Sequence, residues 1–304
     1  MGRPLRLCHR PICWLTRNSG SSKQSARPIP ARGIRGARIA VHGEHPRSAA
    51  VSLVPHPRFA TPAGGQLRQW QHRGLALGAD GVPQEVTSVF DSYGAGPPPA
   101  AGRTARASHS AWPRRHVLGV DLGADVVRRL QIRPNGVLAE GEPVVVLPAG
   151  TGPRQIRVSA DQRTAYVLGE LSGELITVAL GPLRLGAIVN RRPAWLSDPS
   201  GPNLPARLLA VGDRLYVSRR GLDRITVFGL KNDVPTPLTE IETGTWPRHF
   251  ALSGRWLYTA DQLDDQMTVH DLRSSRDSGQ ISLHIPIWRP TCVLLVALGS
   301  GRPP

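Results

Sequence analysis

The most regular hydrophobic pattern of the chain lies in residues 152–180, GPRQIRVSADQRTAYVLGELSGELITVAL. Three short runs rich in β-branched and aromatic residues, at 156–158, 165–168 and 175–178, are separated by two polar turns containing Ser, Asp, Gly and Glu. Runs of this length between turn residues are typical of antiparallel strands joined by tight turns. The pattern therefore predicts a meander of consecutive strands.

Two later segments repeat this pattern, LPARLLAVGDRLYVSRRGLDRITVFGL from residue 204 and WPRHFALSGRWLYTADQLDDQMTVHDL from residue 246. When the three units are overlaid, Tyr166, Tyr216 and Tyr258 coincide. A period of about 40 to 50 residues with three or four strands per unit is that of propeller blades. Because one blade cannot bury both of its faces alone, neighbouring blades must stack around an axis.

These units resemble the lactonase-type seven-bladed β-propellers, a family that includes bacterial 6-phosphogluconolactonases and fungal carboxymuconate-lactonising enzymes. The resemblance is carried by GPRQIRVSADQRTAYVLGELSGE, LYVSRRGLDRITVF and WPRHFALSGRWLYTADQLDDQMTV, together with VDLGADVVRRLQI and PTCVLL. It covers about residues 116–296. It implies an all-β fold, a β-propeller of four-stranded blades, with residues 116–304 as the propeller blades.

The region before residue 116 fits this pattern poorly. Residues 1–50 are basic, with scattered Arg, Ser, Gly and Pro and few apolar runs, and we expect them to be disordered. In residues 51–115, the stretch GLALGADGVPQEVTSVFDSY resembles part of a family blade but its neighbours do not, which predicts degenerate partial blades. Alternating matched and unmatched stretches suggest the hypothesis of short reading-frame slips, which would leave the ring incomplete or irregular at its N-terminal end.

The net charge of +16 at first suggests a nucleic-acid partner, but its distribution argues against one. Residues 1–115 hold 17 Lys and Arg against 4 Asp and Glu, whereas residues 116–304 hold 21 against 18. The repeat-bearing region is therefore nearly neutral. Since all basic residues except Lys23 and Lys231 are arginine, a GC-rich coding background explains the excess, and we expect no nucleic-acid partner.

The three cysteines, Cys8, Cys13 and Cys292, provide no disulfide framework. No apolar run reaches the roughly 18 residues that a membrane span needs, and the N-terminus lacks the apolar core of a signal peptide. A cytoplasmic protein without a membrane partner is expected. Cys8-His9 with Cys13 lacks the second ligand pair of a zinc finger, so we expect no metal. No GxGxxG loop is present, and we expect no cofactor.

The resemblance also implies a catalytic carboxylate. Opening a lactone requires a water molecule activated by a base, and stabilisation of the developing oxyanion. Glu170 follows the strand at 165–168 and matches the acidic residue of the family's Asn-Glu-Leu motif, which implies the role of base. The preceding Asn is Gly169 here. The alternative interpretation is a solvated turn carboxylate. His109 is the nearest counterpart of a functional family His and is a second catalytic candidate, although its surroundings do not match.

Three arginines are candidates for substrate binding. Arg154 matches the arginine of the family's Gly-Pro-Arg, and Arg248 in Trp-Pro-Arg takes the corresponding place in another unit. Arg220 matches the arginine of the family's Ser-Asn-Arg-Gly, with Arg219 in place of the Asn. Guanidinium groups suit phosphate because they donate two parallel hydrogen bonds. A set of three could converge on one anion at the mouth of the central channel.

The function implied by the resemblance is that of a 6-phosphogluconolactonase-like hydrolase, which opens a sugar-phosphate lactone without metal in carbohydrate metabolism, within the pentose phosphate pathway. The partner would be a small-molecule lactone, and a monomer is favoured. Two alternatives stay open. One is a cycloisomerase acting on an acidic lactone such as carboxymuconolactone. The other is a non-catalytic propeller that serves as a binding platform, because fold alone does not decide function.

Overall fold

The computed structural model describes the backbone alone for one part of the chain, and the backbone and side chains for another. For the strands at residues 12–17, 50–56, 59–66, 71–77, 83–91 and 107–112 it describes the backbone. Side chains are described for residues 116–133, 137–183, 185–198, 201–272 and 279–296, except those of 140–142 and 296. Among the described residues, no helix has the length and apolarity needed to cross a bilayer.

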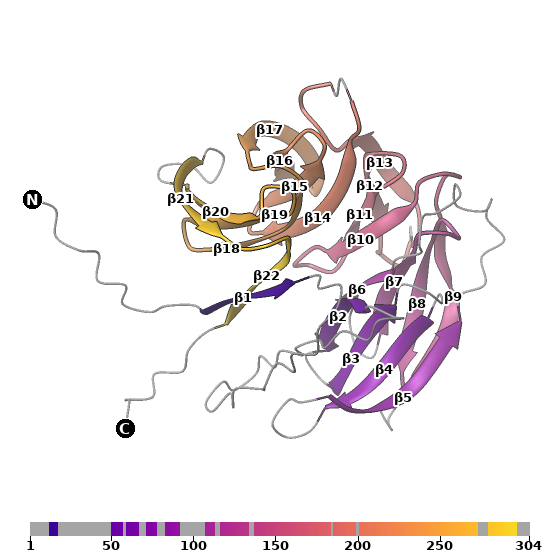
Figure 1. Ribbon diagram of the computed structural model, residues 1–304. Helices are drawn as coiled ribbons and strands as arrows, with labels where there is room; N and C mark the ends of the chain where they lie inside the picture. The colour runs from indigo at the N-terminus through magenta and orange to yellow at the C-terminus, as the bar shows by residue number, and fades with distance from the viewer. Residues whose placement is uncertain are drawn as a thin grey trace, which may run out of the picture.

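The described chain forms five four-stranded antiparallel sheets and one two-stranded sheet (Figure 1). Within each four-stranded sheet the strands are neighbours in chain order. The first two sheets comprise β2 (Ala50–His56), β3 (Phe59–Gln66), β4 (Gln71–Leu77) and β5 (Pro83–Asp91), then β6 (Ala107–Trp112), β7 (His116–Asp121), β8 (Val126–Ile132) and β9 (Leu138–Val146). The third comprises β10 (Pro153–Val158), β11 (Thr164–Gly169), β12 (Glu174–Ala179) and β13 (Ile188–Pro193).

The fourth sheet comprises β14 (Leu204–Val211), β15 (Arg214–Arg220), β16 (Arg224–Lys231) and β17 (Val234–Glu242). The fifth comprises β18 (Pro247–Ser253), β19 (Trp256–Asp261), β20 (Gln266–Asp271) and β21 (Gln280–Pro286). The two-stranded sheet pairs β1 (Ile12–Arg17) with β22 (Pro290–Val296). The all-β prediction of four-stranded propeller blades is confirmed.

The first strands of successive blades contact one another. β6 contacts both β2 and β10, β10 contacts β14, β14 contacts β18, and β18 contacts β22. These are therefore the inner strands, from which the later strands of each blade follow outward, as Figure 1 shows for the β14–β17 and β18–β21 blades. The three tyrosines of the sequence repeat, Tyr166, Tyr216 and Tyr258, lie on second strands at equivalent places.

Three features fall on the region for which the sequence predicted partial blades or disorder. β2 to β5 form a four-stranded sheet within residues 50–91. β6 pairs with β7 and so completes a blade that spans residue 116, where the sequence pattern improves. β1 lies within the N-terminal 50 residues and pairs with β22. The other residues expected to be disordered lie outside the described residues.

Hydrophobic contact between blades explains why they stack. Successive side chains of a strand point to opposite faces of its sheet. On β11, Val167 packs with Leu118 and other residues of the preceding blade, whereas Tyr166 and Leu168 pack with Leu208 of the following blade. All five side chains are fully buried. Each blade thus buries both faces only against two neighbours, as stacked repeats require.

A repeated aspartate fastens neighbouring blades to one another. Asp125, Asp223 and Asp265 each stand immediately before a third strand, with φ of 52°, 55° and 51°. In each case a carboxylate oxygen accepts a hydrogen bond from the residue that precedes the next inner strand: Gly152 N at 2.7 Å, Trp246 N at 2.8 Å and Arg289 N at 2.8 Å. We call this contact the aspartate clip. It fixes the place at which each following inner strand begins.

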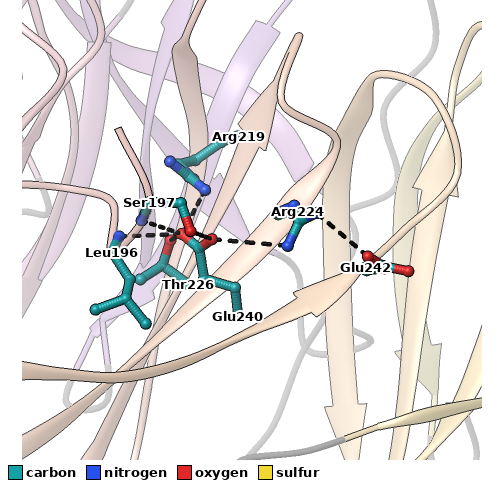
Figure 2. A network of polar contacts seen from close by, with 7 residues as sticks. All are labelled: Leu196, Ser197, Arg219, Arg224, Thr226, Glu240 and Glu242. Carbon is teal, nitrogen blue, oxygen red and sulfur yellow. Dashed lines mark hydrogen bonds and ion pairs between the residues drawn. The ribbon is translucent and has the colours of Figure 1, made fainter. Parts of the chain in front are cut away.

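A second contact between blades is built around a buried ion pair (Figure 2). Arg219 on β15 is completely buried, and its Nη2 lies 2.5 Å from Glu240 Oε1 on β17. The same carboxylate accepts hydrogen bonds from Leu196 N at 3.0 Å and Ser197 Oγ at 2.8 Å. Leu196 and Ser197 follow β13, so Glu240 ties the end of one blade to the next.

Candidate functional site

Strand register places the predicted site residues at two repeated positions. Pro153 on β10 pairs with Gly169 and Pro247 on β18 pairs with Asp261, and in both strands a β-bulge follows the proline. Arg154 and Arg248 are the extra residues of these bulges. The residue that ends or follows the second strand is the other position, and there the three blades have Glu170, Arg220 and Gln262.

The structure brings Glu170 together with two of the predicted arginines. Glu170 Oε2 lies 2.8 Å from Arg154 Nη1, and Oε1 lies 2.5 Å from Arg220 Nη2. All three residues are buried, with 7%, 8% and 4% of their surface exposed. The interpretation of Glu170 as a solvated turn carboxylate does not describe this geometry. Both carboxylate oxygens instead take part in buried, charge-assisted hydrogen bonds.

Backbone contacts hold these side chains in place. Arg154 Nε donates to the carbonyl oxygen of Ala206 at 2.5 Å, and Arg220 Nε donates to that of Leu204 at 3.2 Å. Glu170 N donates to Gly152 O at 2.8 Å, so the turn that carries the carboxylate is tied to the loop before β10. Each guanidinium group is therefore held by backbone on one side and by Glu170 on the other.

Gly169, which replaces the Asn of the family motif, is required by the packing of this turn. A Cβ atom at this position would lie 2.8 Å from the carbonyl oxygen of Thr151 and still closer to the hydroxyl of Ser172. Any larger residue would displace the loop. The departure from the family motif is thus accommodated locally, and Glu170 still points to the arginines.

Arg248 completes a cluster of three cations around one carboxylate. Its Nη1 donates to Gln262 Oε1 at 3.1 Å, the residue that follows β19. Burial, together with the positive charges of Arg154 and Arg220 and against the opposing charge of Glu170, lowers the pKa of Arg248 to about 10. We name Glu170, Arg154, Arg220 and Arg248 the arginine–glutamate cluster. Its excess of positive charge suits an anionic ligand.

Trp246 packs against the guanidinium group of Arg220. The guanidinium carbon of Arg220 lies 5.5 Å from the centroid of the Trp246 ring, a cation–π distance. Trp246 has φ of 63°, a strained value for a residue with a side chain, and the aspartate clip from Asp223 holds its amide. The clip therefore positions both Trp246 and the strand that begins with Pro247 and Arg248.

The protonation state of Glu170 reflects two opposing effects. Burial raises its pKa, but the charges of Arg154 and Arg220 and their hydrogen bonds outweigh burial and lower the pKa below its ordinary value of 4.5. Glu170 is therefore ionised at neutral pH. A carboxylate held in this way is a weak proton acceptor until a ligand takes over part of its hydrogen bonding.

Arg219 does not join the cluster, although it adjoins Arg220 in sequence. Its side chain points to the opposite face of the sheet and pairs with Glu240. The substrate-binding role predicted for Arg220 therefore does not extend to Arg219. The catalytic candidate His109 lies on β6, and its side chain lies outside the described residues.

Sequence reasoning missed Gln262, Trp246 and the aspartate clip. The signal for the clip was present, since an aspartate directly precedes the run of the third strand in LGADVV, GLDRITV and LDDQMTV. In the described part of the chain, no three His, Cys, Asp or Glu side chains are placed to hold a metal ion.

Comparison with known proteins assigns the family. Residues 73–295 match the family model of lactonases with a seven-bladed β-propeller. The chain belongs to this family. The match includes every residue of the arginine–glutamate cluster.

Two curated relatives are 6-phosphogluconolactonases. The protein of Bacillus subtilis is 28% identical over 189 residues, which are 59% of this chain and 53% of the relative. The protein of Formosa agariphila is 27% identical over 160 residues, 49% of this chain and 45% of the relative. The chain thus spans about half of the length of these relatives.

Solved structures share the fold at low sequence identity. A protein from Lactobacillus plantarum superposes with a TM-score of 0.71 at 22% identity, over 78% of this chain and 71% of its own. The periplasmic gluconolactonase PpgL of Pseudomonas aeruginosa gives a TM-score of 0.70 at 23% identity, over 82% and 74%. Both support the propeller architecture.

Proposed function

We propose that this protein hydrolyses a sugar-phosphate lactone, 6-phosphogluconolactone, to the open acid. The observation that carries the proposal is the arginine–glutamate cluster of a chain of the lactonase family, in which buried Arg154 and Arg220 pair with Glu170 and the partly buried Arg248 is within reach of its charge. Similarity to two 6-phosphogluconolactonases supports the choice of substrate class.

The reaction consumes one water molecule. Water attacks the carbonyl carbon of the lactone, and the proton that it loses passes to Glu170. The bond between this carbon and the ring oxygen then breaks, and Glu170 passes its proton to the ring oxygen, which becomes a hydroxyl group. Arg154, Arg220 and Arg248 stabilise the negative charge on the carbonyl oxygen in the transition state, because preorganised donors in a buried site need no reorganisation.

Glu170 becomes a stronger base when the substrate binds. In the structure both of its oxygens are occupied by guanidinium donors, which keeps its pKa low. An anionic substrate competes for the same donors and raises the pKa of Glu170 toward its ordinary value. The cluster therefore couples substrate binding to activation of the base.

The wider setting belongs to the same proposal. A lactonase of this specificity serves carbohydrate metabolism in the pentose phosphate pathway. We place the enzyme in the cytoplasm as a monomer that binds a small lactone, with neither nucleic acid nor membrane as a partner.

The test is hydrolysis of 6-phosphogluconolactone by the purified chain, measured against spontaneous ring opening. We expect acceleration that falls at least 100-fold in Glu170→Ala, the typical contribution of a general base. Glu174→Ala is the matched control, since Glu174 pairs with the half-exposed Arg191 at the surface. Absence of acceleration would exclude the lactonase. Conversion of carboxymuconolactone instead would favour the cycloisomerase, and tight binding without turnover would favour the binding platform.

A further inference from the structure

A second group of basic side chains lies on the inner strands, outside the arginine–glutamate cluster. Arg157 lies on β10, Arg207 on β14 and His249 on β18, which are the inner strands of three consecutive blades. Arg207 pairs with Ser218 and His249 with Ala260, so these two occupy the same position of their blades. Arg157 is three residues beyond Arg154, about 10 Å along the strand at ~3.3 Å per residue.

These three side chains have few polar partners among the described residues. Arg207 Nε is buried and has no hydrogen-bond partner among the described residues. Arg157 Nη1 donates to the carbonyl oxygen of its own neighbour Ile156 at 2.7 Å. His249 accepts a hydrogen bond at Nδ1 from Val293 N at 3.2 Å. An uncompensated guanidinium group inside a protein is costly, which calls for a partner that the described chain does not provide.

The electrostatics agree with this geometry. Burial, and to a smaller extent the charge of Arg207, lowers the pKa of Arg157 to about 9. Burial also lowers the pKa of Arg207, against a smaller opposing effect of Cys292. Burial and then the charges of Arg207, Arg157 and Arg154 hold the pKa of His249 well below 6.5, so this ring is neutral at pH 7. Among the described residues, no carboxylate offsets these charges.

The three side chains are nevertheless half-buried rather than sealed from solvent. Groups that are poorly hydrated but retain exposed surface can be reached by a small solute. A doubly charged oxyanion would satisfy the unpaired Arg207 Nε and relieve the repulsion between the two guanidinium groups. Arginine forks match phosphate oxygens in geometry.

We infer that Arg157 and Arg207 form a second anion site, specific for a phosphate group, deeper along the inner strands than the arginine–glutamate cluster. The existence of this site is independent of the reaction. Its use in catalysis rests on the proposed function: the phosphate end of an extended six-carbon substrate would lie at Arg157 and Arg207, while its lactone end lies at Glu170.

The test is calorimetric titration of the purified chain with inorganic phosphate at constant ionic strength. We expect saturable binding that weakens at least tenfold in Arg157→Leu and in Arg207→Leu. Arg191→Leu, which removes a half-exposed arginine paired with Glu174, is the matched control and should bind as the wild type does. Arg248→Leu should retain the binding, because it alters only the other cluster.

Thermal unfolding of the same variants shows whether each of them still folds. Without phosphate, Arg207→Leu should melt no lower than the wild type, because it removes an uncompensated charge, and phosphate should no longer raise its melting temperature. If Arg207→Leu fails to fold, Arg207→Lys and Arg157→Leu take its place in the test. In both variants, phosphate should no longer raise the melting temperature. Phosphate binding that survives both substitutions, or is lost only in Arg248→Leu, overturns the inference, as does a wild type that binds no phosphate.

Two further ligands separate this inference from the proposed reaction. Phosphate binding without any lactonase activity would sustain the second anion site and refute the hydrolase. In an active enzyme, Arg207→Leu should raise the KM for 6-phosphogluconolactone at least tenfold and leave that for unphosphorylated gluconolactone unchanged. An equal rise in the KM for both lactones would mean that the phosphate group of the substrate does not bind at Arg207.

Discussion

Arg220 and Glu170 meet across the boundary between two blades, with Nη2 of one 2.5 Å from Oε1 of the other, although 50 residues separate them in the chain. They occupy equivalent positions of their blades, at or just beyond the end of the second strand. Opposite charges at equivalent positions of consecutive repeats pair when the blades stack. The ion pair therefore depends on the same packing that forms the propeller.

Arg248 is the cation of this cluster whose removal should separate binding from stability. We expect Arg248→Met to raise the KM for the lactone at least tenfold, because it removes the cation of the cluster that no direct ion pair offsets among the described residues. Its melting temperature should not fall, because burial and then repulsion from Arg154 and Arg220 disfavour the charge of Arg248 and lower its pKa. Steady-state kinetics and thermal melts check both. A lower melting temperature with an unchanged KM would contradict the assignment.

Gly221 is expected to hold Arg220 in place through its backbone. Its φ is +95°, and a Cβ atom there would collide with the carbonyl oxygen of Pro202. Gly254 has a φ of +59°, but nothing lies within 4 Å of its Cβ position. Gly254→Ala should therefore cost about 1 kcal/mol of unfolding free energy. Gly221→Ala should cost more and also impair activity, and equal costs in urea denaturation would disprove this explanation.

The blades could be predicted from the sequence because each unit repeats a pattern of strand and turn residues around its tyrosine. Such patterns are local, and they locate second and third strands well. β6 was harder to predict, since its residues, ASHSAW, carry neither β-branched residues nor a repeat match. Its place in the sheet comes from pairing with β7 rather than from its own sequence.

The convergence of Arg154, Arg220 and Arg248 on Glu170 was expected from family motifs, whereas Arg157 and Arg207 were not noticed. Alternation predicts which face of a strand a residue occupies, but a β-bulge reverses it for all later residues. Register shifts after Pro153 and Pro205 do this on both inner strands. The sequence does not show such shifts, so it could not place these side chains. The catalytic and binding roles stay predictions.

The buried pair of Arg219 and Glu240 should respond unequally to loss of either partner (Figure 2). Glu240→Ala leaves a fully buried guanidinium without its carboxylate and deprives Leu196 N and Ser197 Oγ of their acceptor. We expect a loss of about 3 kcal/mol of unfolding free energy. Arg219→Met should cost less, because it fills the space and leaves Glu240 with hydrogen bonds from Leu196 N, Ser197 Oγ and Thr226 Oγ1 and with Arg224 at 3.9 Å.

The control for this pair is Glu242→Ala, since the Glu242 side chain is 77% exposed and its contact with Arg224 lies at the surface. Exposed pairs contribute about 0.2–1 kcal/mol. Urea denaturation of the single and double variants gives the coupling energy directly. If Arg219→Met proved as destabilising as Glu240→Ala, the unpaired-charge explanation would fail.

Asp261 should make the protein less stable as pH rises from about 4 to about 6. The residue is fully buried, and its Oδ2 accepts hydrogen bonds from Thr268 Oγ1 at 2.5 Å and Thr259 Oγ1 at 3.1 Å. The pKa of Asp261 is raised from 3.8 to about 6. Burial is the main cause, the hydrogen bonds from Thr268 and Thr259 oppose it, and the charge of Asp264 adds to it. The folded state thus holds this proton more tightly than the unfolded state. The contribution of Asp261 to stability is then greatest below pH 3.8, falls as the unfolded state ionises, and is constant above pH 6.

Asp261→Asn removes this dependence. The unfolding free energy of the variant minus that of the wild type should increase between pH 4 and pH 7 by up to about 3 kcal/mol, the equivalent of roughly two pKa units. Glu242→Gln, a substitution of an exposed side chain, should differ from the wild type by less than about 0.5 kcal/mol at either pH. Urea denaturation at both pH values measures the change. A difference that stays constant would mean that Asp261 is ionised in the folded protein at pH 4.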